Sequence, residues 1–149
     1  MKNHSVAHNQ LSKFVGKWHT EGLIPGTHNT PAISIKGTDT YMWIVDGYFL
    51  LHTADVTIGD DNSQTHEIIG YDYLNNHYTM QHYNNKGNSG LMTATVKDNI
   101  WTFVGDDLRF TGGFNEEEDE FTGIWEHHSM TSGWSHLMNI KLSKKIETK

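Results

Sequence analysis

Histidines are the residues in this sequence best suited to chemistry. Eleven are spread over 149 residues, and three of them stand in the segment WEHHSMTSGWSH (residues 125–136), which a tryptophan opens and a second tryptophan nearly closes. Imidazole groups titrate near neutral pH, transfer protons and ligate metals. Because the histidines are scattered along the chain, a shared site requires the fold to bring them together.

One turn fixes the face on which the first of these histidines lies. The pair Asp46-Gly47 is flanked by alternating apolar residues, a pattern that predicts a β-hairpin with a two-residue type I′ turn. A shift of one residue would exchange the two faces of the hairpin, so the apolar set identifies the inward side. This side carries three predicted cross-strand pairs: Val45 with Tyr48, Trp43 with Leu50, and Tyr41 with His52.

The same alternation assigns an inward face in three later segments. Residues 134–142 alternate in a way that turns Trp134 and His136 inward. In residues 121–128 the pattern turns Trp125 and His127 inward and Glu126 and His128 outward. The alternation in residues 78–84 predicts inward positions for Tyr78, Met80 and His82. Four histidines from different strands are therefore expected to share one interior.

Turn signals recur every 8–12 residues or so after Lys17, which predicts about ten short strands joined mostly by hairpins. No helical segment lies between them, so parallel β/α architectures are excluded. The one predicted helix covers residues 6–14, with Ser5 as its N-cap, and is expected to cover one end. We therefore predict an all-β protein, a closed antiparallel β-barrel of about ten strands that forms a single domain over residues 1–149.

Composition excludes several classes of function. A formal net charge of −7 disfavours a nucleic-acid partner, and the absence of cysteine excludes disulfides and thiol catalysis. No apolar run is long enough for a signal peptide or a membrane span, so we expect a cytoplasmic protein with no membrane partner. Five Trp, six Tyr and six Phe suit strands around a concave pocket.

Several sequence segments, taken in their order along the chain, resemble those of a known family. They are LSKFVGKWHTEG, YMWIVDGYFLLH, EIIGYDYLNNHYTMQHYNNKG and RFTGGF…FTGIWEHHSMTSGW. In this order they resemble the DUF1579 family of calycin-like bacterial proteins, similar in outline to lipocalins, fatty-acid-binding proteins and nitrobindins. The resemblance implies an antiparallel barrel with an internal cavity, and it implies no established activity.

The function expected from these observations is binding of a small, mostly apolar or aromatic molecule in an aromatic- and His-lined cavity. The candidate ligand-binding residues are Tyr41, Trp43, His52, Met80, His82, Trp125, His127, Trp134 and His136. No metal ligand, cofactor or catalytic residue is assigned. An outward apolar patch of Met42, Ile44, Phe49 and Leu51 suggests a homodimer.

Five alternatives remain open at this stage. The inward histidines can be plain polar wall residues, or three of them can hold zinc with an open position for water. A haem-binding barrel is a third possibility, although Thr20 replaces the middle glycine of the nitrobindin-type G-x-W-x-G-x-G pattern. A fourth is a cofactor-free isomerase, cyclase or hydrolase that uses a cavity His with Glu or Tyr, where Glu67 and Glu126 are the carboxylates within apolar strands. A filled homodimeric scaffold would have no ligand at all.

Overall fold

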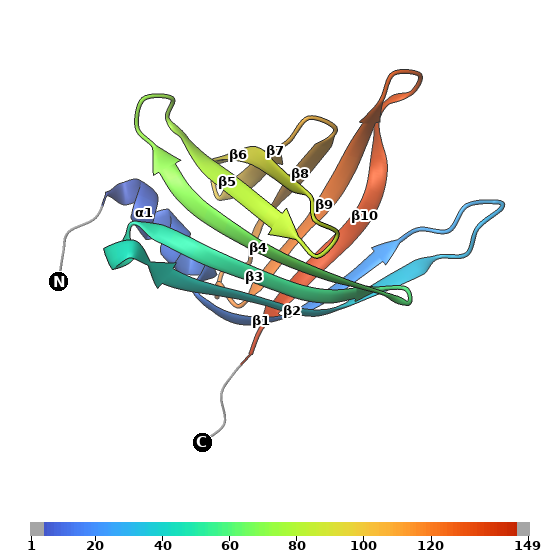
Figure 1. Ribbon diagram of the computed structural model, residues 1–149, viewed down its shortest axis with the longest axis horizontal. Helices are drawn as coiled ribbons and strands as arrows, with labels where there is room; N and C mark the ends of the chain where they lie inside the picture. Colours follow the sequence, from blue (N-terminus) through green and yellow to red (C-terminus); the bar gives the residue numbers. More distant parts are fainter. Residues whose placement is uncertain (1–4, 146–149) are drawn as a thin grey trace.

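Ten antiparallel strands close into a barrel in the computed structural model, which describes residues 5–145 (Figure 1). The strands are β1 (Gly16–Ile24), β2 (Ile33–Ile44), β3 (Phe49–Ile58), β4 (Asp61–Asp72), β5 (His77–Asn84), β6 (Ser89–Lys97), β7 (Ile100–Val104), β8 (Leu108–Phe114), β9 (Glu120–Ser129) and β10 (Gly133–Lys144). Each strand pairs with its neighbours in sequence, and β1 pairs with β10 to close the sheet. Closure leaves no free sheet edge, and it confirms the predicted fold class.

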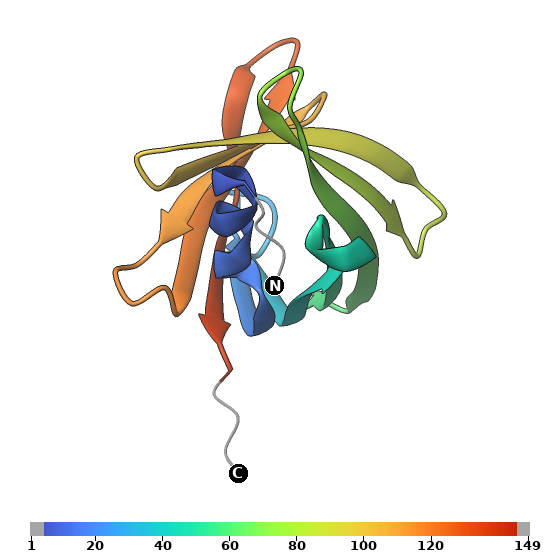
Figure 2. The same ribbon diagram turned by 90° about the vertical axis from the view of Figure 1, so that its left-hand side faces the viewer.

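The predicted N-terminal helix forms and closes one end of the barrel (Figure 2). It consists of α1 (Val6–Leu11) followed by a 3₁₀ turn, η1 (Ser12–Phe14), and the Ser5 hydroxyl accepts a hydrogen bond from the His8 backbone N–H at its start. Phe14 enters the barrel and packs with ring centroids 5.2 Å from Tyr41 and 5.1 Å from Trp101. In the described part of the chain, no helix has both the length and the apolar character needed to cross a membrane.

The β2–β3 hairpin has the predicted register, but the strands end at Ile44 and Phe49, and Val45 and Tyr48, predicted as an inward cross-strand pair, are exposed in the connection between them. Asp46 has φ 61° and ψ 28°, Gly47 has φ 84°, and the Tyr48 N–H donates to the Val45 carbonyl at 3.2 Å, as in a type I′ turn. The short η2 segment (Val45–Gly47) is this turn. Two predicted pairs are observed in the ladder: Tyr41 with His52 and Trp43 with Leu50.

A β-bulge in β10 overturns one part of the predicted pattern. The register with β9 shifts between His136, which pairs with Glu126, and Met138, which pairs with Trp125. The bulge accommodates one extra residue, Leu137. The side chains of residues 134–136 therefore lie on the opposite face from the one that strict alternation predicts. Met138 still points inward, as predicted, but Trp134 and His136 point outward, so their inward assignment was wrong.

The solid core lies beside the helix, at the end that α1 closes. Leu11, Trp18 and Trp101 are each at most 2% exposed, and so is Phe110, which also faces the space beyond this core. Burying one such side chain contributes roughly 1.5–3 kcal/mol. Gly123, on the inward face of β9, leaves the space for the Phe110 ring, because an added Cβ would come within 2.2 Å of that ring. This end of the barrel is packed, and space remains toward the other end.

Candidate functional site

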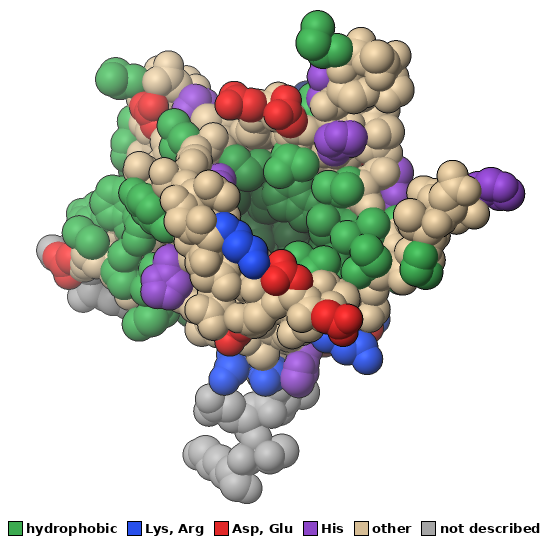
Figure 3. All heavy atoms as spheres, turned by 45° about the vertical axis from the view of Figure 1, so that its right-hand side comes forward, with side chains coloured by type: hydrophobic (Ala, Val, Ile, Leu, Met, Phe, Trp, Pro, Cys, Tyr) green, Lys and Arg blue, Asp and Glu red, His purple; other side chains and the backbone are tan. Residues whose placement is uncertain are grey.

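A cavity of about 300 Å³ occupies the barrel interior beyond this packed end. Figure 3 views the molecule from the side away from α1 and shows a hollow lined by hydrophobic side chains. Ile58 at the end of β3 and Leu108 at the start of β8 belong to the lining near this opening. Much of the remaining wall is apolar and aromatic, and includes Met80, Met92, Phe103, Phe110, Phe121 and Trp125.

One wall of the cavity carries a chain of polar side chains from four consecutive neighbouring strands. The Thr20 hydroxyl on β1 donates to Asp39 Oδ2 on β2. The other Asp39 oxygen, Oδ1, lies 2.5 Å from His52 Nε2 on β3. The second ring nitrogen, His52 Nδ1, lies 2.9 Å from Glu67 Oε1 on β4. Both carboxylates belong to residues only 7% exposed.

Strand pairing explains why these residues meet. His52 and Glu67 are directly opposite in the β3–β4 ladder. Asp39 is opposite Ala54, two residues along from His52, so the two side chains are diagonal neighbours on one face. The chain of hydrogen bonds therefore follows from register, and it runs across the sheet rather than along a strand.

His52 is an imidazolium at neutral pH. Burial by itself lowers its pKa, but the hydrogen bonds to Asp39 and Glu67, together with the charges of both carboxylates, outweigh burial and raise the pKa of His52 to about 9. The Tyr41 ring stacks on the imidazole at 4.1 Å between centroids, with an angle of 7° between the planes. Burial, followed by the nearby charges of Asp39 and Glu67, raises the pKa of the Tyr41 phenol well above its ordinary value, so it stays neutral.

Five of the predicted site residues line this cavity together: Tyr41, His52, Met80, His82 and Trp125. Trp43 does not line it, because it packs against the edge of the core beside the helix, 6.4 Å from the His8 ring. The inward orientation of the five is as predicted, and their contact with a ligand stays a prediction.

The remaining three predicted residues lie outside the cavity. His127 is exposed. Trp134 lies on the outer face, with the Arg109 guanidinium 4.3 Å above its ring, and Arg109 forms an ion pair with Glu126 at 3.0 Å. His136 is exposed on the outer face and hydrogen-bonds Asn139 at 2.6 Å. The bulge in β10 is the reason for the outward positions of Trp134 and His136.

Two polar residues of the cavity wall were not predicted from the sequence. Asp39 is two residues before Tyr41, and Thr20 is two residues after Trp18, so each shares the inward face of its strand with an aromatic residue. Extending the period-two alternation through polar positions would have found them. Glu67 was noted as a carboxylate within an apolar strand, but its partner was not identified.

Comparison with known proteins places this barrel in a family. The family model described as "Protein of unknown function (DUF1579)" matches residues 3–107. The chain belongs to the DUF1579 family. No curated protein matches the sequence of this DUF1579 protein.

A solved structure shows the same fold. The crystal structure of Rv2717c from M. tuberculosis resembles the DUF1579 protein with a TM-score of 0.70, over 97% of this chain and 100% of that chain, at 10% sequence identity. A likeness at this identity shows the fold and carries no information on function.

The histidines considered for zinc are not brought together in the DUF1579 protein. His52 lies inside the barrel between two carboxylates, whereas His127 and His136 are exposed. Within residues 5–145, no three His, Asp or Glu side chains are arranged to hold a metal ion. The zinc alternative, which required three inward histidines in one site, therefore has no such site in the described part of the chain.

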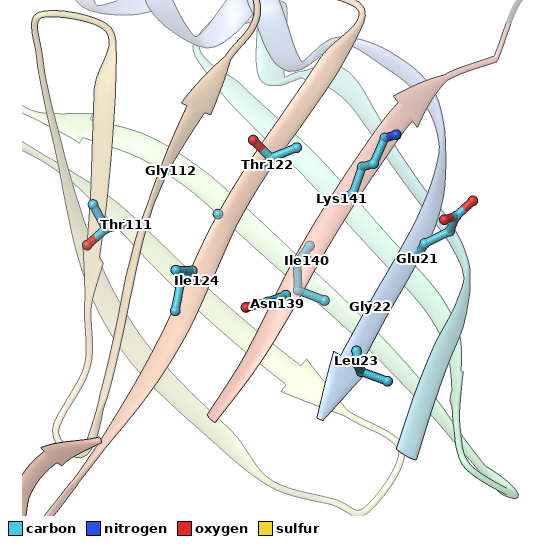
Figure 4. A pocket seen from close by; sticks show the side chains of 11 residues that line it. Glu21, Gly22, Leu23, Thr111, Gly112, Thr122, Ile124, Asn139, Ile140 and Lys141 are labelled. Atoms are coloured by element: carbon cyan, nitrogen blue, oxygen red, sulfur yellow. The ribbon is translucent and has the colours of Figure 1, made fainter. Parts of the chain in front are cut away.

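Two features of the outer surface contrast with the cavity. An open trough crosses β8, β9, β10 and β1, where the side chains of Thr111, Thr122 and Lys141 project outward (Figure 4). It holds no convergent polar cluster comparable with that of the cavity wall.

On the outward side of the β2–β3 hairpin, Met42 and Phe49 are 51% and 37% exposed. Dimerisation through the patch of Met42, Ile44, Phe49 and Leu51 stays a prediction.

Proposed function

We propose that this DUF1579 protein reversibly binds a small, mostly apolar molecule in the barrel cavity. The observation that carries the proposal is a cavity of about 300 Å³ with an apolar lining and a single polar wall. Ligand sites in proteins combine these features, because apolar surface supplies affinity and a few polar groups fix orientation. The helix closes one end of the barrel, so a ligand enters from the other.

The size of the cavity limits the ligand. Liquid water occupies about 30 Å³ per molecule, so the space corresponds to roughly ten waters, or a ligand of roughly ten non-hydrogen atoms. Such a ligand would displace water from an apolar wall, which is favourable by roughly 25 cal/mol per Å² of apolar surface buried. A long-chain lipid would extend beyond the opening.

The state of His52 weighs against general-base catalysis by this residue. A general base must be unprotonated and within reach of its substrate. His52 is protonated at neutral pH because its pKa is raised to about 9, and both ring nitrogens are hydrogen-bonded to carboxylates. The same bonds leave no nitrogen of His52 available as an axial ligand to haem iron. Reversible binding is the function that the cavity supports best.

A pair of matched variants tests the proposal. Ala54 lines the cavity, while Thr53 is its neighbour on the other face of β3. We expect Ala54→Phe to fill the cavity and abolish binding of an apolar fluorescent probe, with Thr53→Phe as the control that keeps binding. Both variants are checked for folding by circular dichroism, and native mass spectrometry of protein from its own host looks for a bound molecule.

Two results would overturn the proposal. One is equal probe binding by Ala54→Phe and the wild type, which would place the probe elsewhere on the molecule. The other is a native protein that carries no small molecule and binds none of a panel of apolar probes at millimolar concentration.

A further inference from the structure

The polar wall of the cavity has one hydrogen-bonding position left over. Both oxygens of Asp39 are used, one by Thr20 and one by His52, and both nitrogens of His52 are used by the two carboxylates. Glu67 Oε1 accepts from His52, but within residues 5–145 no protein group donates to Glu67 Oε2. Glu67 has a side chain 9% exposed and lines the cavity, so this unused acceptor belongs to the cavity wall.

The charges of the same wall are also unbalanced. Asp39 and Glu67 contribute two negative charges and protonated His52 contributes one positive charge, which leaves a net charge of −1. The lining contains no Lys or Arg that would compensate it. A buried charge without a partner is costly, because the apolar surroundings replace few of the interactions it had with water.

The other titratable groups that face this wall do not donate a hydrogen bond to Glu67 Oε2. Tyr41 is a neutral phenol stacked on His52. His82 lies on β5 directly opposite Glu67 and lines the cavity, but no hydrogen bond joins the two side chains among the described residues.

We infer that the ligand of this cavity is a small hydrophobic ammonium ion, a protonated primary amine on an apolar body, whose nitrogen pairs with Glu67 Oε2. The inference rests on the proposed function and names its ligand class. An ammonium group supplies the missing donor and the missing positive charge at one position. A carboxylate ligand would instead add a second uncompensated negative charge to the wall.

Three ligands with the same alkyl chain isolate the head group: octylammonium, octanol and octanoate. Each is titrated into the full-length protein by isothermal calorimetry at about pH 7.5, where a primary amine with a pKa near that of lysine, about 10.4, is fully protonated. We expect octylammonium to bind about ten- to a hundredfold more tightly than octanol, since hydrogen bonds to charged groups are of that strength. Octanoate is expected to bind more weakly than octanol.

The variant Glu67→Gln assigns the preference to this carboxylate. It keeps a side-chain oxygen for His52 and removes the negative charge, so octylammonium should lose its advantage while octanol keeps its affinity. Glu126→Gln is the matched control, because Glu126 lies on the outer face beside Arg109. The control should retain the full preference for the amine. The comparison of the three ligands on the wild type stands even if Glu67→Gln does not fold.

The outcomes separate this inference from the proposed function. Equal or weaker binding of octylammonium relative to octanol would overturn the inference and leave an apolar ligand site in place. A preference for the amine that persists in Glu67→Gln would also overturn it. If none of the three ligands binds, and the apolar probes fail as well, both the ligand class and the proposed function are wrong.

Discussion

Because His52 is charged in the folded protein, the free energy of unfolding should fall as the pH rises into the alkaline range. One substitution, at His52, should remove this pH dependence. The folded protein holds the pKa of His52 at about 9, against an ordinary value of 6.5. A pKa raised on folding stabilises the folded state fully below the unfolded value, and the stabilisation is lost as the pH rises through the folded value. The relevant window is therefore between pH 6.5 and pH 9.

The size of the effect follows from the two pKa values. Their difference of about 2.5, at about 1.4 kcal/mol for each pKa unit, corresponds to roughly 3 kcal/mol of folding free energy at low pH. Of this, about 2 kcal/mol should remain at pH 7.5 and almost none at pH 10. The imidazole side chain is only 15% exposed, so solvent screening reduces the effect little.

The assay is urea denaturation of the wild type and His52→Gln at several pH values between about 7.5 and 10, above the range in which exposed histidines titrate. We expect the free energy of unfolding of the wild type to fall by about 2 kcal/mol more than that of the variant. Burial raises the pKa of Tyr41 as well, but this affects both proteins and cancels in the difference. His136→Gln, which changes an exposed histidine, should behave like the wild type.

Parallel pH dependence in the wild type and His52→Gln would refute the reasoning. It would mean that His52 is neutral in the folded protein or that its charge contributes nothing to folding. An imidazole nitrogen NMR spectrum at neutral pH distinguishes these two cases, because both ring nitrogens carry a proton and have similar shifts in the protonated ring, whereas only one carries a proton in the neutral ring.

Three further predictions concern packing and the location of the site. Phe14→Ala should reduce the free energy of unfolding by about 3–5 kcal/mol in urea denaturation, because this 3% exposed ring packs among aromatic neighbours at the closed end. Gly123→Ala should cost roughly 1–3 kcal/mol in the same assay, since the new methyl group would meet the Phe110 ring, and an unchanged midpoint would contradict the packing described. Trp125→Ala should weaken binding of an apolar probe about tenfold or more, whereas Trp134→Ala on the outer face should leave the probe's affinity unchanged, and the reverse order would place the site outside the barrel.

The sequence by itself determined the barrel and much of its inner face. The Asp46-Gly47 turn set the register of β2 against β3, and with it the pairing of Tyr41 with His52. This worked because a type I′ turn permits one register and because side chains in a regular strand alternate strictly between faces. Met80 and Trp125 were placed in the interior by the same argument.

Only the tertiary structure decided which polar groups meet and where β10 changes face. A bulge inserts one residue without a sequence signal strong enough to locate it, and it moved Trp134 and His136 from the expected interior to the outer surface. The bonds from His52 to Asp39 and Glu67 depend on the register of three strands at once, which no single segment specifies. Alternation gives the face on which a side chain lies, but its partners across the sheet exist only once the barrel has closed.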